Sequence, residues 1–157
     1  MKNKTCCFTG HRSIPSEQYV KIKAELQKEI INLINKGVIY FGSGGAFGFD
    51  ILSAEVVLEL KKQYPQIKLI MVFPCKNHTK YWSKKDIEKY EHIKRFRDKY
   101  VYVSEKYDYD CMKRRNRHLV NFSEYCICYF NQPNSGTAYT INYAEEKGLT
   151  IINIANK

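Results

Sequence analysis

Three short segments of the chain combine glycine with residues that bind anions. Thr9-Gly10-His11-Arg12 follows an apolar run near the N-terminus. The second segment, residues 42–50, holds four glycines, and the third, residues 131–137, ends in Ser-Gly-Thr. Glycine exposes backbone N–H groups, arginine forms paired hydrogen bonds with phosphate, and a helix N-terminus attracts anions. Together the three segments predict a site for a phosphate-bearing ligand.

In the first segment, His11 and Arg12 add side chains that are able to bind a ligand to the turn that Gly10 permits. Gly10 permits a close backbone approach, and Arg12 is able to pair with a phosphate through two hydrogen bonds. His11 either donates to a phosphate or takes part in acid–base chemistry. The alternative is a structural turn in which the His11 ring packs. A Gly-His-Arg sequence at this place favours ligand binding.

The second segment resembles a nucleotide-binding loop without matching either standard pattern. No Gly-Lys-Ser/Thr follows the glycines, so it is not a Walker A loop, and the third glycine of G-x-G-x-x-G falls one position late, at Gly48. A standard NAD site is therefore disfavoured. The glycines still predict uncovered N–H groups before a helix. Asp50 either caps that helix or accepts a hydrogen bond from a ligand hydroxyl.

The third segment is preceded by a basic cluster. Ser135, Gly136 and Thr137 predict a second phosphate-binding site at the start of a helix, with an ordinary helix cap as the alternative. In residues 112–117, Arg115 lies about 100° from Arg114 and about 160° from Arg117 around a helix, so the three arginines do not share one face. We therefore expect only one of them to face the site.

The elements that must position these residues alternate between two patterns. Short apolar runs rich in β-branched and aromatic residues predict strands at residues 5–9, 38–41, 68–73, 100–103, 125–130 and 150–154. Helical spacing of apolar residues predicts helices at residues 16–36, 50–63, 83–98, 110–122 and 137–147. This order predicts one α/β domain over residues 1–157, a Rossmann-like three-layer α/β/α sandwich with a mostly parallel sheet of about six strands. Such sheets bind ligands beyond the carboxyl ends of their strands, where the three glycine segments fall.

The net charge of +10 is concentrated in residues 76–117, which hold 14 basic and 7 acidic residues. Such a field favours phosphates, nucleotides or nucleic acid, although a solvated surface gives the same composition. The six cysteines form no Cys-x-x-Cys pair and no zinc-binding spacing, so we expect no metal site. No apolar run approaches the ~20 residues of a membrane helix, and no signal peptide is visible. We expect a cytoplasmic protein with free, buried thiols and no contact with membranes.

Three motifs in one order carry a family resemblance. CCFTGHR, GGAFGFD and MKRRNRHLVNFSEYCICYFNQPNSGTAYT resemble the SLOG superfamily, and more narrowly its YpsA/YspA-like branch of small bacterial and phage proteins. The resemblance spans nearly the whole chain. It implies a Rossmann-like fold that senses or processes nucleotides or nucleotide-derived ligands. The superfamily also includes the Lonely Guy phosphoribohydrolases and the DNA-processing protein DprA, and it commonly dimerises, so a homodimer is expected.

The phosphoribohydrolase motif is only partly present. Its Met-x-x-Arg-Lys element aligns with Met112, Arg115 and Asn116, so Arg115 matches the catalytic arginine of that branch. In its second element, Thr140 stands where the catalytic glutamate belongs. A neutral hydroxyl does not stabilise an oxocarbenium-like charge as a carboxylate does. The resemblance therefore leaves catalysis open, with Arg115, Asp50 and His11 as the candidate catalytic residues.

The sequence thus predicts a protein that binds a nucleotide or nucleotide-derived ligand, as a sensor or regulatory protein, with no further cofactor. The alternatives are a phosphoribohydrolase-like N-glycosidase and a DprA-like protein that binds single-stranded DNA. The candidate ligand-binding residues are Gly10, His11, Arg12, Ser43, Gly44, Gly45, Gly48, Asp50, Arg115, Asn116, Ser135, Gly136, Thr137 and Thr140. Trp82, the only tryptophan, either stacks on a base or closes the core.

Overall fold

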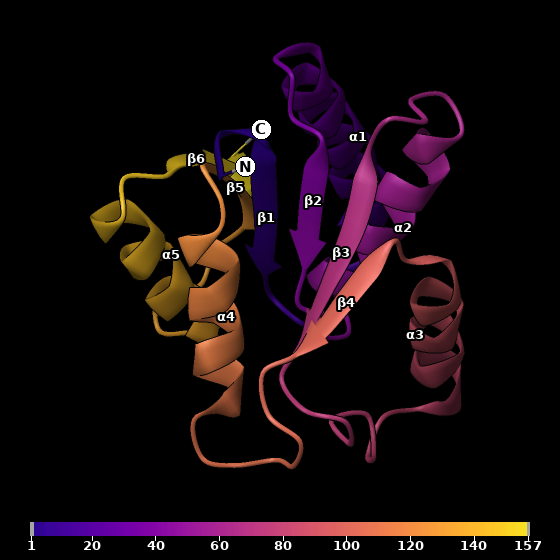
Figure 1. Cartoon of the computed structure of the whole chain (residues 1–157), viewed down its shortest axis with the longest axis vertical. Coiled ribbons are helices and arrows are strands. Elements are labelled where there is room, and N and C mark those ends of the chain that lie inside the picture. Colours follow the sequence, from indigo (N-terminus) through magenta and orange to yellow (C-terminus); the bar gives the residue numbers. More distant parts are fainter. Residues whose placement is uncertain (1, 157) are drawn as a thin grey trace.

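The computed structural model describes residues 2–156 and places six strands in one parallel sheet (Figure 1). The strands are β1 (Thr5–Gly10), β2 (Tyr40–Ser43), β3 (Lys68–Phe73), β4 (Lys99–Tyr102), β5 (Tyr125–Tyr129) and β6 (Thr150–Asn153). Their order across the sheet is β4-β3-β2-β1-β5-β6, and every adjacent pair is parallel. From β1, the strands β2, β3 and β4 follow on one side, and β5 and β6 lie on the other side. The strand order therefore reverses between β1 and β5, and ligands of such folds bind at this switch point.

Five α-helices cover the two faces of the sheet. They are α1 (Tyr19–Asn35), α2 (Phe49–Lys61), α3 (Lys84–Phe96), α4 (Cys111–Asn121) and α5 (Gly136–Glu146), with short 3-10 helices at Lys2–Lys4, Ser16–Gln18 and Ile154–Asn156. Figure 1 shows α1, α2 and α3 on one side of the sheet and α4 and α5 on the other. The prediction of a Rossmann-like three-layer sandwich is confirmed.

Each face of the sheet has its own buried core, because consecutive strand residues point to opposite faces. On β1, Cys6 and Phe8 join the larger core beneath α1, α2 and α3, while Cys7 joins the smaller core beneath α4 and α5. All three side chains are at most 1% exposed. This double coverage explains why β1 is a continuous apolar run rather than an alternating one. Burial of a side chain such as Phe8 stabilises the fold by roughly 1.5–3 kcal/mol.

The boundaries of β2 and α1 differ from the predicted ones. The predicted strand at residues 38–41 is shifted to Tyr40–Ser43, because Gly42 pairs with Cys7 on one side and with Ile70 on the other. The helix predicted from Ser16 begins as a 3-10 turn and becomes α1 only at Tyr19. Gly42 and Ser43, predicted as loop residues, therefore belong to the sheet.

The cysteines confirm the expectation of free, buried thiols. All six lie within the described residues, are buried and form no disulfide. Burial raises the pKa of Cys6, and burial followed by the charge of Cys7 raises the pKa of Cys128 to about 12. These thiols stay protonated at neutral pH. Separately, none of the helices in residues 2–156 has the length and apolar character that a membrane span requires.

The segment after β3 folds back onto α3 around a half-buried histidine. A hydrogen bond of 3.1 Å joins His78 Nε2 to the Tyr90 hydroxyl, and the His78 ring lies 5.3 Å from Trp82 and 5.5 Å from Phe73. Burial, together with the positive charges of Arg115 and nearby cations, lowers the pKa of His78 to about 4. The folded protein therefore holds this imidazole neutral.

His78 predicts a pH-dependent stability. Between about pH 6.5 and 4 the unfolded chain binds a proton at His78 that the folded chain does not, so the free energy of unfolding falls as the pH falls. We expect this fall in the free energy of unfolding to be about 1–2 kcal/mol smaller in His78→Gln than in the wild type. Each pKa unit corresponds to ~1.4 kcal/mol, and solvent screening reduces that figure for a half-buried group. Urea unfolding at pH 7 and pH 4.5 measures it. His92→Gln, at an exposed site on α3, is the control, and an equal change in both variants would contradict the prediction.

Candidate functional site

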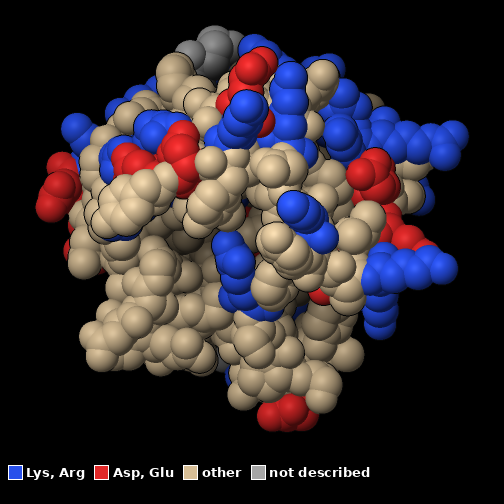
Figure 2. Space-filling view, turned by 90° about the horizontal axis from the view of Figure 1, so that it is seen from below, with Lys and Arg blue, Asp and Glu red and all other residues tan. Residues whose placement is uncertain are grey.

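A cavity of about 400 Å³ opens at the switch point, beyond the carboxyl ends of β1 and β5. Its lining residues are Thr9, Gly10, His11, Arg12, Ser13, Ala46, Asp50, Met112, Arg115, Asn116, Gln132, Ser135, Gly136 and Thr137. They come from the loop after β1, the loop entering α2, the first turns of α4 and the loop entering α5. Figure 2 looks onto this edge of the molecule and shows isolated basic side chains in a largely uncharged, hollowed centre.

Arg115 is the buried cation of the cavity, with only 4% of its surface exposed. Its Nη1 donates to the Gly44 carbonyl at 2.5 Å and its Nε donates to Asn116 Oδ1 at 2.6 Å. A Cβ on Gly44 would lie 2.7 Å from Arg115 Cδ, so glycine is required to admit the side chain. Burial lowers the pKa of Arg115 and the Asp50 charge opposes that change.

The other two arginines of the cluster point away from the cavity. Arg114 pairs with Asp108 at 2.7 Å, and Arg117 pairs with Asp110 at 3.0 Å and donates to the Tyr139 hydroxyl at 2.8 Å. The helix geometry thus brings one arginine of the three into the site, as expected.

Asp50 brings a carboxyl group into the same cavity. Asp50 lies in the first turn of α2 rather than at the cap, which is Gly48, so the capping interpretation is wrong. Its Oδ2 accepts a hydrogen bond from the Ala46 N–H at 3.3 Å. Burial raises the pKa of Asp50, while the nearby charge of Arg115 opposes the rise. The cavity therefore holds a desolvated carboxyl group near a buried guanidinium.

His11 is buried against the end of β5 and still lines the cavity. Its Nε2 accepts a hydrogen bond from the Asn131 N–H at 3.0 Å, so the proton of the neutral ring is assigned to Nδ1. The ring packs edge-on against Tyr129, with centroids 5.7 Å apart. Burial lowers the pKa of His11, which favours the neutral ring. His11 thus serves the packing of the turn and offers an uncharged donor group.

Arg12 supplies a second, solvent-exposed cation. Its guanidinium lies over the Phe47 ring, 5.2 Å from the centroid, a cation–π contact that orients a long side chain. Arg12 and Arg115 carry two positive charges beside one carboxyl group, Asp50. The cavity is therefore suited to an anionic ligand.

The N-terminus of α5 closes the cavity from the opposite side. Ser135 caps the helix, since its Oγ accepts from the Ala138 N–H at 3.3 Å. The N–H groups of Gly136 and Thr137 have no acceptor within the helix, and both residues line the cavity. A Cβ on Gly136 would meet no atom within 4 Å. The helix end thus presents its positive dipole and free donors to the cavity.

In the glycine-rich loop before α2, the N–H groups of Gly45, Ala46 and Phe49 form hydrogen bonds within the protein, contrary to the expectation that they are uncovered. Ser43 Oγ accepts from the Gly45 N–H at 3.3 Å and donates to the Asp50 carbonyl at 2.8 Å. The Phe49 N–H donates to the His11 carbonyl. Gly45, at φ +73°, packs against the Phe73 ring. From this loop only Ala46 and Asp50 line the cavity, so Ser43, Gly44, Gly45 and Gly48 support the site rather than face it.

Thr140 and Trp82 also lie outside the cavity lining. Thr140 is buried in α5, where its hydroxyl donates to the Gly136 carbonyl at 3.4 Å. Trp82 is half-buried and packs edge-on against Phe47 at 5.4 Å and Tyr90 at 5.6 Å. The structure thus shows packing for Trp82, and base stacking stays a prediction.

Five lining residues were absent from the predicted set: Thr9, Ser13, Ala46, Met112 and Gln132. Met112 lies three positions before Arg115 on α4, and helical spacing places such a pair on one face. Thr9 and Ser13 flank the predicted turn at Gly10. The signal was therefore present in the sequence for these three residues.

The cavity unites groups for two kinds of chemistry. Two guanidinium groups and a helix N-terminus bind phosphate, and a desolvated carboxyl group close to a cation is suited to proton transfer. The catalytic candidates Arg115, Asp50 and His11 all line it, whereas Thr140 does not. Across residues 2–156, no three His, Cys, Asp or Glu side chains are grouped in a way that would hold a metal ion.

Comparisons with known sequences place this arrangement in a family. The sequence model of the YspA SLOG family matches residues 6–154. A UPF0398 protein of Bacillus pumilus is 32% identical over 134 residues, which cover 83% of this chain and 71% of the relative. YoqJ, an SPbeta prophage-derived protein of Bacillus subtilis, is 31% identical over 143 residues, covering 83% of this chain and 84% of the relative.

Two solved structures share the fold at low sequence identity. DNA processing protein A from Streptococcus pneumoniae superposes with a TM-score of 0.68 and 16% identity, and the protein of the same name from Helicobacter pylori with 0.68 and 18%. The match covers 96% of this chain in both cases, but only 50% and 64% of those chains. The likeness therefore concerns the Rossmann-like fold, and this chain spans about half to two thirds of those proteins.

Proposed function

The chain belongs to the YspA SLOG family, and from this premise we propose that it binds a nucleotide or nucleotide-derived ligand at the switch point as a sensor or regulatory protein. One observation carries the proposal. Arg12, Arg115 and the N-terminus of α5 converge on one cavity from three segments distant in the sequence. Packing alone does not require two cations and a free helix N-terminus around one hollow.

The ligand's phosphate is proposed to lie at the start of α5. There the N–H groups of Gly136 and Thr137 donate to its oxygens, and the two guanidinium groups offset its charge. The volume of about 400 Å³ falls in the range of roughly 300–1,000 Å³ that is usual for small-molecule sites. Asp50 and Asn116, which also belong to the lining, are suited to hydroxyl and amino groups of the rest of the ligand.

A thermal-shift panel tests the proposal and names the ligand class. The panel contains nucleoside mono-, di- and triphosphates, ADP-ribose, NAD, cyclic dinucleotides and short single-stranded DNA. A ligand at a hundred times its dissociation constant adds about 2.7 kcal/mol, which is a shift of several degrees for a chain of this size. A panel without any shift would contradict the proposal.

Gly136 provides a matched pair of variants. Because a Cβ at this position meets no atom within 4 Å, Gly136→Ala is expected to fold and bind like the wild type. Gly136→Asp places a carboxylate beside the phosphate position, and we expect it to lower the nucleotide affinity by about tenfold or more. Calorimetric titration of both variants measures this. Equal affinities for the two variants would place the phosphate elsewhere.

The hydrolase alternative uses the same cavity and differs from the sensor function in that it releases a product. Asp50, Arg115 and His11 would carry the reaction, since Thr140 replaces the carboxylate of the phosphoribohydrolases and is buried in α5. Chromatography of each nucleotide after incubation with the protein detects free base. Release of free base that Asp50→Asn abolishes would establish that the protein is an enzyme. Nucleotides that stay intact would favour the sensor function over the hydrolase alternative.

A second candidate function, binding of single-stranded nucleic acid, is favoured by exposed tyrosines at the same edge of the sheet. Tyr81, after β3, is 90% exposed, while Tyr107 and Tyr109, after β4, are 62% and 101% exposed. The segment after β3 also carries Lys76 and Lys80, and exposed aromatic rings among cations stack on bases. One solved relative by fold is described by its single-stranded DNA binding mode. Anisotropy of labelled oligo(dT) at two salt concentrations tests it, and absence of binding at low salt would remove it.

A further inference from the structure

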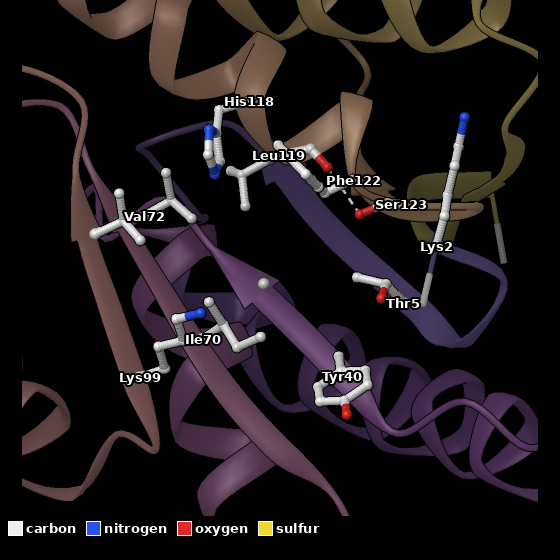
Figure 3. A pocket seen from close by; sticks show the side chains of 12 residues that line it. Lys2, Thr5, Tyr40, Ile70, Val72, Lys99, His118, Leu119, Phe122 and Ser123 are labelled. Carbon is white, nitrogen blue, oxygen red and sulfur yellow. Dashed lines mark hydrogen bonds between the residues drawn. The ribbon is translucent and has the colours of Figure 1, made fainter.

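A second cavity, of about 470 Å³, lies on the α4 side of the sheet, away from the switch-point site. Its floor is formed by β2, β3 and β4 and its wall by α4 (Figure 3). Alternate residues of these strands face it: Tyr40 and Gly42, Ile70 and Val72, Lys99 and Val101. Helices cover the opposite face of the same three strands (Figure 1), whereas on this side Ile70 and Val101 are half-buried and Lys99 is exposed.

The middle of the floor is apolar, and the wall combines Leu119 and Phe122 with the polar His118 and Ser123. Gly42 is paired with Ile70, and Val72 with Val101, so the four positions form a continuous patch without polar side chains. A Cβ on Gly42 would come within 2.9 Å of Leu119, so glycine at this position lets the α4 side chain pack onto the floor. On the wall, Phe122 is 62% exposed. Ile70, Val101 and Phe122 therefore offer partly exposed apolar surface at this cavity.

The charge at the borders of this face has one sign. Lys2 and Lys99 come from opposite sides of the cavity in Figure 3, and no Asp or Glu belongs to its lining. Within residues 2–156, neither lysine forms an ion pair with a carboxylate. Two unpaired cations beside a partly exposed apolar floor are complementary to an apolar partner with acidic flanks.

We propose that this face binds an amphipathic helix of a partner protein, with its apolar stripe on Ile70 and Val101 and with Asp or Glu side chains on Lys99 and Lys2. The shape favours a helix. Three strands span about 10 Å, which is close to the diameter of a helix, and this layer of the fold already consists of helices. A second copy of the chain is disfavoured, because a two-fold contact through this face would bring the lysines of both copies together.

A displayed library of 18-residue amphipathic sequences with random residues beside the apolar stripe, selected on the full chain, tests the proposal. We expect the selected sequences to carry Asp or Glu in the flanks. A synthetic selected peptide should lose at least tenfold in affinity for Lys99→Glu and for Phe122→Ala. A peptide with its acidic residue changed to Lys should regain affinity for Lys99→Glu. Such a charge exchange does not arise from a folding defect.

Lys85→Glu, the same charge change on an exposed position of α3 across the sheet, is the control and should bind the peptide like the wild type. Absence of enriched sequences would overturn the proposal, as would selected peptides that are basic or that bind Lys99→Glu unchanged. Analytical sedimentation of the chain without peptide tests the other possible occupant of this face, a second copy of the chain. A dimer that Phe122→Ala dissociates would show that a second copy covers this face and would also overturn the proposal.

Discussion

Replacing Arg115 by methionine is expected to lower the affinity for the nucleotide found by the panel by about 100-fold. Arg115 is the buried guanidinium of the cavity, and a charge-assisted hydrogen bond to phosphate contributes about 1.5–3 kcal/mol. Loss of one or two such bonds therefore reduces binding by one to four powers of ten, at ~1.4 kcal/mol for each tenfold step. Methionine keeps the volume of the side-chain stem beside Gly44, which limits collapse of the loop. Calorimetric titration measures the affinity.

Arg114→Met is the matched control for this prediction. Arg114 is the neighbouring residue on α4, it is solvent-exposed in part, and it pairs with Asp108 outside the cavity. Its replacement should leave the nucleotide affinity within about twofold of wild type, because surface ion pairs contribute little. Arg115→Lys keeps the charge without the planar geometry and should lie between the two. Wild-type affinity in Arg115→Met would remove this residue from the site.

The layers of the fold were predictable because the residue types in each strand reflect whether one or both of its faces are buried. β1 reads as a continuous apolar run since helices cover both of its faces, and the same holds for β5. β2 was misplaced by two residues, because its last two positions are Gly42 and Ser43, which locally favour a turn. Pairing with β1 and β3 on either side overrides that preference. Because these partners are distant in the sequence, the four residues of β2 alone do not predict the pairing.

The site was predictable where local rules decide it. The start of α5 follows from Ser135-Gly136-Thr137, and the turn after β1 from Gly10. The prediction for the glycine-rich loop fails for Gly45 and Ala46, whose N–H groups donate to the side chains of Ser43 and Asp50. Those bonds exist only once β2 and α2 are packed, so no local pattern shows them. The loop is glycine-rich to let other groups approach it closely rather than to expose its own backbone.

Among these glycines, Gly48 is expected to tolerate replacement least. It precedes α2 at φ +87° and ψ −127°, a conformation that residues with a Cβ rarely adopt. A Cβ would lie 2.3 Å from the Arg12 carbonyl oxygen and 2.6 Å from the Arg12 carbonyl carbon, and backbone atoms cannot rotate away as a side chain does. Gly48→Ala must therefore separate the turn after β1 from the start of α2.

We expect Gly48→Ala to lower the free energy of unfolding by about 3 kcal/mol or more, which corresponds to a fall in Tm of roughly 6–12 °C. Gly37→Ala isolates the cause. Gly37 has a similar φ of +97°, but no atom lies within 4 Å of its added Cβ, so it suffers only the backbone strain of about 1 kcal/mol. Thermal unfolding of the two variants, followed by circular dichroism, therefore measures the contact between the Arg12 backbone and α2 by difference. Equal losses would mean that the turn at Arg12 yields freely, and a cavity wall that yields so easily would not hold Arg12 in place for a phosphate.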